Sequence, residues 1–93
     1  MSADGPSFSH VVIYSSPLCG YCGAAVRLLK MKGAEFLEIN VEQNPQHRQE
    51  MAKLSGRKTV PQIFIGGRSI GGYTELNALE MAGELESLLA EQS

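Results

Sequence analysis

The apolar positions of the chain alternate between the spacing of buried strands and the wider spacing of helices. Residues 11–14 form a continuous apolar run that predicts a buried strand. Helical spacing follows over about 21–31, and Gly33 suits the residue just past the end of a helix. Residues 35–41 alternate and predict a second strand. Such a strand–helix–strand unit pairs its strands in parallel with a right-handed crossover.

The middle of the chain predicts a second helix and then a hairpin. Asn44 before Pro45 is a helix start, and the thin apolar stripe to about Leu54 predicts a mostly exposed helix. Residues 61–65 are apolar enough for a third strand. Gly66-Gly67 is a two-residue hairpin signal, so residues 68–70 are expected to return antiparallel.

The end of the chain predicts helices. Thr74 is the expected N-cap of a third helix that reaches Ala82, and the apolar positions of 85–89 form one face of a last helical segment. The order of elements favours an α/β domain with a four-stranded mixed sheet and helices on both faces. We expect residues 1–93 to form one domain, with residues 1–9 as a flexible N-terminus.

Composition narrows the function classes. The net charge of −2 gives no sign of nucleic-acid binding, and no stretch is long enough to span a bilayer. Residues 1–9 lack the charged-then-apolar pattern of a secretion signal. We therefore expect a cytoplasmic protein in a reducing compartment, where a Cys-x-x-Cys pair near a βαβ pattern indicates redox chemistry.

Cys19 and Cys22 are the only cysteines, and they have the spacing of a reversible redox pair. They follow the first predicted strand and open the first helix, at the sheet edge where ligands gather. A zinc half-site is the first alternative, but zinc needs three or four protein ligands, and His10 and His47 are not spaced as a finger pair. A static disulfide is the second, but such a bridge stabilises by closing a long loop.

Three motifs in this order give the chain a family resemblance. Cys19-Gly20-Tyr21-Cys22, the stretch 59–65 (Thr-Val-Pro-Gln-Ile-Phe-Ile) and Gly71-Gly72 before a helix closely resemble the dithiol Cys-x-Tyr-Cys glutaredoxins, within the thioredoxin fold. The resemblance runs from about His10 to Leu89. It implies a glutathione-dependent thiol–disulfide oxidoreductase that reduces glutathionylated or disulfide-bonded proteins.

The resemblance also implies roles for individual residues. Cys19 is expected to be the nucleophile and Cys22 the resolving thiol, while Pro61 resembles the family's cis-proline. The Val60 backbone is then expected to pair with glutathione like an added strand. The residues implied to bind glutathione are Tyr21, Arg57, Thr59, Val60, Pro61, Gly72, Tyr73 and Thr74.

The charged groups at the two ends of glutathione suggest which of these residues bind each end. Backbone N–H groups of Tyr73 and Thr74, at a helix start, suit the γ-glutamyl carboxylate. Many relatives have an aspartate where this chain has Thr74, and Glu75 next to it is a candidate to supply the missing charge. Arg57 and Lys58 are the candidate cations for the glycine carboxylate.

Two departures from the family pattern bear on chemistry. Many relatives have a lysine three residues before the nucleophile, where this chain has Ser16. The second motif position is Gly20 instead of proline, and in the family a small residue there accompanies a [2Fe–2S] cluster. The alternative function is therefore a cluster carrier or sensor, a homodimer bridged through Cys19 of each chain and two glutathione thiols. Without a cluster we expect a monomer.

Overall fold

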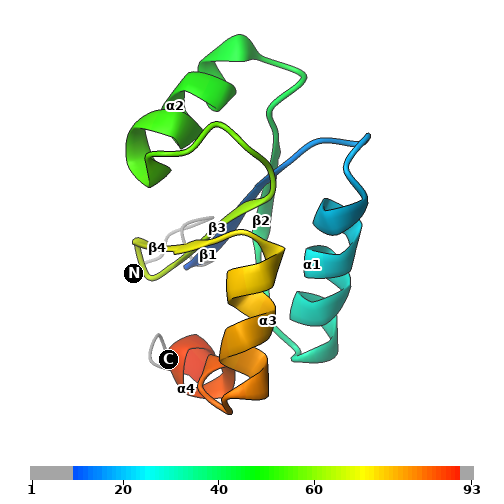
Figure 1. Ribbon diagram of the computed structural model, residues 1–93, viewed down its shortest axis with the longest axis vertical. Helices are drawn as coiled ribbons and strands as arrows, with labels where there is room; N and C mark the ends of the chain where they lie inside the picture. Colours follow the sequence, from blue (N-terminus) through cyan, green and yellow to red (C-terminus); the bar gives the residue numbers. More distant parts are fainter. Residues whose placement is uncertain (1–9, 91–93) are drawn as a thin grey trace, which may run out of the picture.

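The computed structural model describes residues 10–90. The predicted flexible N-terminus, residues 1–9, lies outside these described residues. The described elements in order are β1 (Val11–Ser15), α1 (Gly20–Met31), β2 (Leu37–Asn40), α2 (Pro45–Ser55), β3 (Gln62–Ile65), β4 (Arg68–Gly71), α3 (Tyr73–Met81) and α4 (Leu85–Ala90). Figure 1 shows their arrangement.

The strands form one four-stranded mixed sheet in the order β2-β1-β3-β4. β1 and β2 pair in parallel, whereas β3 runs antiparallel to both β1 and β4. The hairpin between β3 and β4 turns at Gly66 and Gly67, whose φ angles of 60° and 81° favour glycine. The predicted mixed sheet, the parallel first unit and the antiparallel hairpin are all confirmed.

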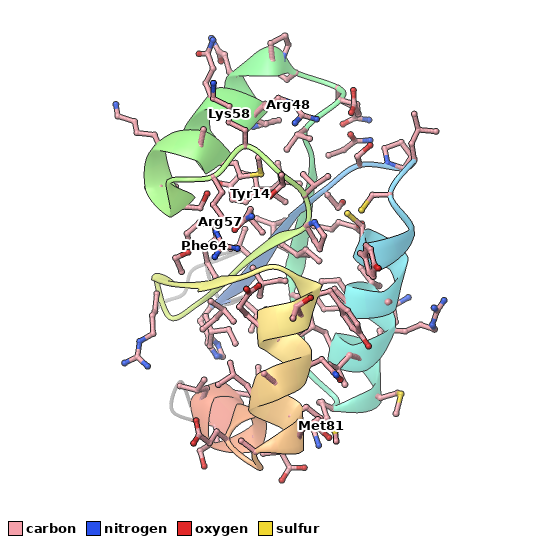
Figure 2. All side chains as sticks on the ribbon, in the orientation of Figure 1. Tyr14, Arg48, Arg57, Lys58, Phe64 and Met81 are labelled. Carbon is pink, nitrogen blue, oxygen red and sulfur yellow. The ribbon has the colours of Figure 1, made fainter. Side chains whose placement is uncertain are left out.

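Helices cover both faces of the sheet (Figure 1). α1, α3 and α4 pack on one face around Ile13, Leu29 and Leu76, which are fully buried. α2 packs on the other face through Met51, which meets Tyr14 and Phe64. These two aromatic rings lie edge to face with centroids 5.7 Å apart (Figure 2). Alternate side chains of β1 and β3 therefore serve opposite cores.

Capping residues begin and end α2 where the sequence predicted. The Asn44 side chain accepts a hydrogen bond from the Gln46 N–H at 2.9 Å, and Pro45 begins α2. Gly56 ends this helix at φ 78°, in the left-handed region. Leu54 is 59 % exposed, which agrees with the prediction of a mostly exposed helix. No helix within residues 10–90 is long and apolar enough to cross a membrane.

The prediction of Thr74 as the N-cap of α3 was wrong. The helix begins at Tyr73 with Gly72 as its N-cap, so Thr74 lies inside the first turn. The cause is Glu75, whose Oε1 accepts a hydrogen bond from the Gly72 N–H at 2.8 Å. A carboxylate at this third helical position satisfies the cap N–H from the helix side.

Candidate active site

Cys19 is the N-cap residue of α1, in the loop that follows β1. Its Sγ accepts a hydrogen bond from the Cys22 N–H at 3.2 Å. The same thiol donates to the Val60 carbonyl oxygen at 3.6 Å, across the gap to the loop before β3. A half-buried sulfur at a helix N-terminus, facing a backbone N–H, is well placed to carry negative charge.

Cys22 has a different environment, although it lies within the same turn. Its residue is 3 % exposed and belongs to the buried part of α1. Burial, followed by the hydrogen bond with Cys19, raises the pKa of the Cys22 thiol to about 12. The pair therefore consists of one accessible thiol and one buried thiol that stays protonated near neutral pH.

The loop opposite Cys19 carries Val60 and Pro61, and the peptide bond between them is cis, as the resemblance implied. The Gly71-Gly72 turn lies directly against this loop. A Cβ atom at Gly72 would come within 3.2 Å of the Pro61 carbonyl oxygen, so glycine permits the close approach.

The residues predicted to bind glutathione come together in one shallow pocket of about 150 Å³. Its lining consists of Tyr21, Arg57, Thr59, Val60, Pro61, Gln62, Gly72, Tyr73, Thr74 and Glu75. They come from the start of α1, the loop before β3 and the start of α3. The pocket thus holds every residue of the predicted set. Neither cysteine lines the larger hollows of about 570 and 450 Å³, although Glu75 lines the first of them as well as the pocket.

The pocket carries one positive and one negative side chain, which suit the carboxylate and ammonium ends of a small peptide. Arg57 Nη1 lies 3.7 Å from Glu75 Oε1. The hydrogen bond from the Gly72 N–H, with help from Arg57, lowers the pKa of Glu75, which is therefore ionised. Tyr21 and Tyr73 stack beside these charges, with ring centroids 6.1 Å apart.

Lys58, the other candidate cation, is not part of this pocket. It lines the hollow beside α2, and its carbonyl oxygen accepts a hydrogen bond from Arg48 at 3.1 Å. Figure 2 shows Arg48 and Lys58 together at α2. Of the two candidates, Arg57 is the one that the structure places in the pocket.

Two sets of hydrogen bonds that hold the loops of the site were not predicted from the sequence. Gln62 is 1 % exposed, and its Nε2 donates to the Thr59 carbonyl oxygen at 3.0 Å, which holds the loop before β3. Its only sequence signal is a polar residue inside an apolar strand. Glu42 joins Ser16 at 3.2 Å to Arg48 at 3.1 Å, and so ties the loop of Cys19 to α2. No sequence pattern links these three residues.

The residues present do not by themselves fit a metal centre or an iron–sulfur cluster. Within residues 10–90, no group of three or more His, Cys, Asp or Glu side chains could hold a metal ion. A cluster needs four cysteine-type ligands, and Cys19 is the one accessible thiol of the described chain. A Cβ atom at Gly20 would meet nothing within 4 Å, so a small residue relieves no crowding within the chain. The bridged alternative would draw its four ligands from Cys19 of two chains and two glutathione thiols, and no contact of the described residues favours it.

The fold and the thiol pair define a thioredoxin-like protein with a dithiol redox site, and comparison with known proteins gives the family. The Glutaredoxin family profile matches residues 11–70. A glutaredoxin from Pseudomonas aeruginosa is 48% identical over 80 residues, covering 86% of this chain and 95% of that protein.

Solved structures agree with this family assignment. The solution structure of glutaredoxin from Brucella melitensis is 52% identical with a TM-score of 0.77, covering 91% of this chain and 94% of that one. The crystal structure of the buckwheat glutaredoxin–glutathione complex is 30% identical with a TM-score of 0.82, covering 88% of this chain and 77% of that one. The chain belongs to the glutaredoxin family, has the predicted thioredoxin-like fold, and is a thiol–disulfide oxidoreductase.

Proposed function

We propose that the protein is a glutathione-dependent oxidoreductase in which Cys19 is the nucleophile and Cys22 the resolving thiol. One observation carries the proposal: the accessible Cys19 thiol contacts Val60, which lines the pocket that contains the whole predicted glutathione set. The structure of buckwheat glutaredoxin in complex with glutathione, a protein of similar fold, supports glutathione as the ligand.

Each end of glutathione has matching groups in the pocket. The first turn of α3 leaves the Tyr73 and Thr74 N–H groups without acceptors in their own helix, which suits the γ-glutamyl carboxylate. Glu75 supplies a negative charge for the ammonium group, and Arg57 a positive charge for the glycine carboxylate. The Val60 backbone pairs with the tripeptide between its ends.

The reaction is a pair of thiol–disulfide exchanges. The Cys19 thiolate attacks the glutathione sulfur of a protein–glutathione mixed disulfide. A bond forms between Cys19 and glutathione, the original disulfide bond breaks, and the protein leaves as a thiolate that takes a proton from solvent. A second glutathione thiolate then attacks the glutathione sulfur on Cys19, releasing oxidised glutathione and the Cys19 thiolate.

Cys22 provides the other route of release. Its thiol, once it gives up its proton, attacks Cys19, forms the Cys19–Cys22 disulfide and expels glutathione. In the reduced protein, burial raises the pKa of the Cys22 thiol, and free glutathione can release Cys19 without it. Cys22 is therefore needed chiefly when the substrate is a disulfide between two protein cysteines.

Serine substitutions of the two cysteines test the proposal. We expect Cys19→Ser to lose turnover of a glutathione mixed disulfide to background in an assay coupled to glutathione reductase. Cys22→Ser is expected to keep that turnover within about twofold, because glutathione replaces Cys22 as the resolving thiol. If Cys22→Ser is as inactive as Cys19→Ser, or if turnover does not depend on glutathione, the proposed roles are wrong.

We also propose the setting in which this chemistry runs. The substrates are glutathionylated or disulfide-bonded proteins, and the chain without a bound cluster acts as a monomer. Cytoplasm is the compartment we infer, because a reducing glutathione pool is needed to regenerate the Cys19 thiolate.

A further inference from the structure

Leu18 is an apolar side chain that lies almost entirely on the surface. It is 91 % exposed, the largest fraction among the large apolar side chains of residues 10–90. It directly precedes Cys19, so the Cα atoms of the two residues are about 3.8 Å apart. A single exposed leucine is ordinary on a protein surface. Leu18 differs from other exposed leucines because it lies next to the proposed nucleophile, Cys19.

The turn that presents Leu18 is held by hydrogen bonds on both sides. The Leu18 N–H donates to Ser16 Oγ at 3.3 Å, and the Cys19 N–H donates to the Ser16 carbonyl oxygen at 3.1 Å. Ser16 Oγ in turn donates to Glu42 Oε2 at 3.2 Å. The backbone of Leu18 is thus ordered before any partner arrives, which lowers the entropy cost of a contact made there.

Leu18 is not among the residues that line the proposed glutathione pocket. A mixed disulfide has two halves, and when the glutathione half fills the pocket the protein half is left outside it. During exchange the leaving protein sulfur lies in line with the Cys19 sulfur, across the glutathione sulfur and within a few bond lengths of Cys19. Leu18, exposed beside Cys19 and outside the pocket, is therefore within the part of the surface that the residues flanking the target cysteine can reach.

Resting on the proposed function, we propose that Leu18 is a docking contact that selects protein substrates with apolar residues next to the glutathionylated cysteine. The occupant is a polypeptide segment of the substrate in an accessible conformation. Removing the Leu18 side chain and an apolar neighbour from water together favours such a segment over one with polar neighbours. Glutathione itself gains nothing from this contact.

Other exposed apolar residues provide matched controls. Met81 is 79 % exposed and lies at the far end of α3 from the pocket, as Figure 2 shows. It has nearly the same exposure as Leu18 without a position beside Cys19. A change of general surface hydrophobicity would therefore affect Met81→Ser and Leu18→Ser alike, whereas a docking contact affects Leu18→Ser alone.

The experiment compares three substrates. Two are glutathionylated peptides that differ only in having leucine or serine on both sides of the cysteine, and the third is the mixed disulfide of glutathione and 2-mercaptoethanol. We expect the wild type to favour the leucine peptide by about fivefold to tenfold in kcat/KM. Leu18→Ser is expected to lose this preference, Leu18→Met to retain it, and Met81→Ser to leave it unchanged. Turnover of the small disulfide is expected to be equal in all four proteins.

The outcomes separate this inference from the proposed function. If the wild type treats both peptides alike, or Leu18→Ser keeps the preference, the docking role is overturned while the oxidoreductase stands. It is overturned also if Leu18→Ser loses the same factor on the small disulfide, because Leu18 then acts on Cys19 or glutathione. If the wild type turns over none of the three substrates, the proposed function fails first.

Discussion

At the scale of single residues, the chemistry depends on a difference between two cysteines that share one helical turn. Cys19 precedes the helix and keeps part of its surface open, whereas Cys22 is 3 % exposed. The N–H of Cys22 donates to the sulfur of Cys19, while the thiol of Cys22 itself is buried. A neutral buried thiol beside an accessible one favours attack by Cys19 first.

This difference predicts which thiol an alkylating reagent modifies. In the reduced protein at pH 7, we expect iodoacetamide to modify Cys22 at least about a hundredfold more slowly than Cys19, because its pKa of about 12 leaves little thiolate. Peptide mapping by mass spectrometry after timed quenching measures both rates. The Cys22 rate should rise with pH up to about 12. Equal rates at pH 7 would contradict the assignment of Cys19 as the nucleophile.

At the scale of elements, the turn between β4 and α3 sets the distance between the pocket walls. Gly71 has a φ of +115°, in a region that favours glycine, and a Cβ atom there would lie 2.9 Å from Cγ and Oε1 of Glu75. Glu75 in turn holds the Gly72 N–H and lies near Arg57. The turn is therefore tight because it must bring the start of α3 against the loop of Pro61.

Alanine at Gly71 should destabilise the fold. Both the unfavourable φ and the contact with Glu75 predict a loss of about 1–3 kcal/mol in the free energy of unfolding for Gly71→Ala, measured by urea denaturation. The matched control is Gly20→Ala. A Cβ atom at Gly20 meets nothing within 4 Å, so this variant should stay within about 0.5 kcal/mol of the wild type. Similar losses in both variants would refute this account of the turn.

At the scale of the whole molecule, Lys32 joins three helices at the end opposite to the thiols. Following the C-terminus of α1, its Nζ lies 3.1 Å from Glu80 of α3 and 2.7 Å from Glu86 of α4. The hydrogen bond from Lys32 lowers the pKa of Glu86. Two acidic side chains near the end of the chain, Glu80 and Glu86, are thus paired with the lysine that follows the first helix.

The ion pairs of Lys32 should make its contribution to thermal stability depend on salt concentration. Lys32→Met is expected to lower the melting temperature at low ionic strength, and this loss should fall by about half or more in 1 M salt because salt screens the carboxylates from the ammonium group. Lys30→Met is the control, since Lys30 has no ion pair among residues 10–90. Thermal unfolding at the two salt concentrations measures both effects. Equal changes in melting temperature for the two variants would contradict a stabilising role for the Lys32 ion pairs.

The sequence alone determined the order and type of the elements. Strand and helix periods, the Asn44-Pro45 start and the Gly66-Gly67 hairpin depend on neighbours along the chain, which the sequence displays directly. The cysteine spacing and the glycine pair also identified the site, because such motifs place their groups within one turn or loop. The predicted glutathione set could be assembled only through the family resemblance.

The tertiary structure decided what depends on contacts between distant segments. The choice of Arg57 over Lys58 follows from how the loop before β3 meets α3. The pKa of Cys22 is raised mainly by burial, which exists only in the folded chain. These features depend on distances across the fold, and the pattern of neighbours along a chain carries no record of them.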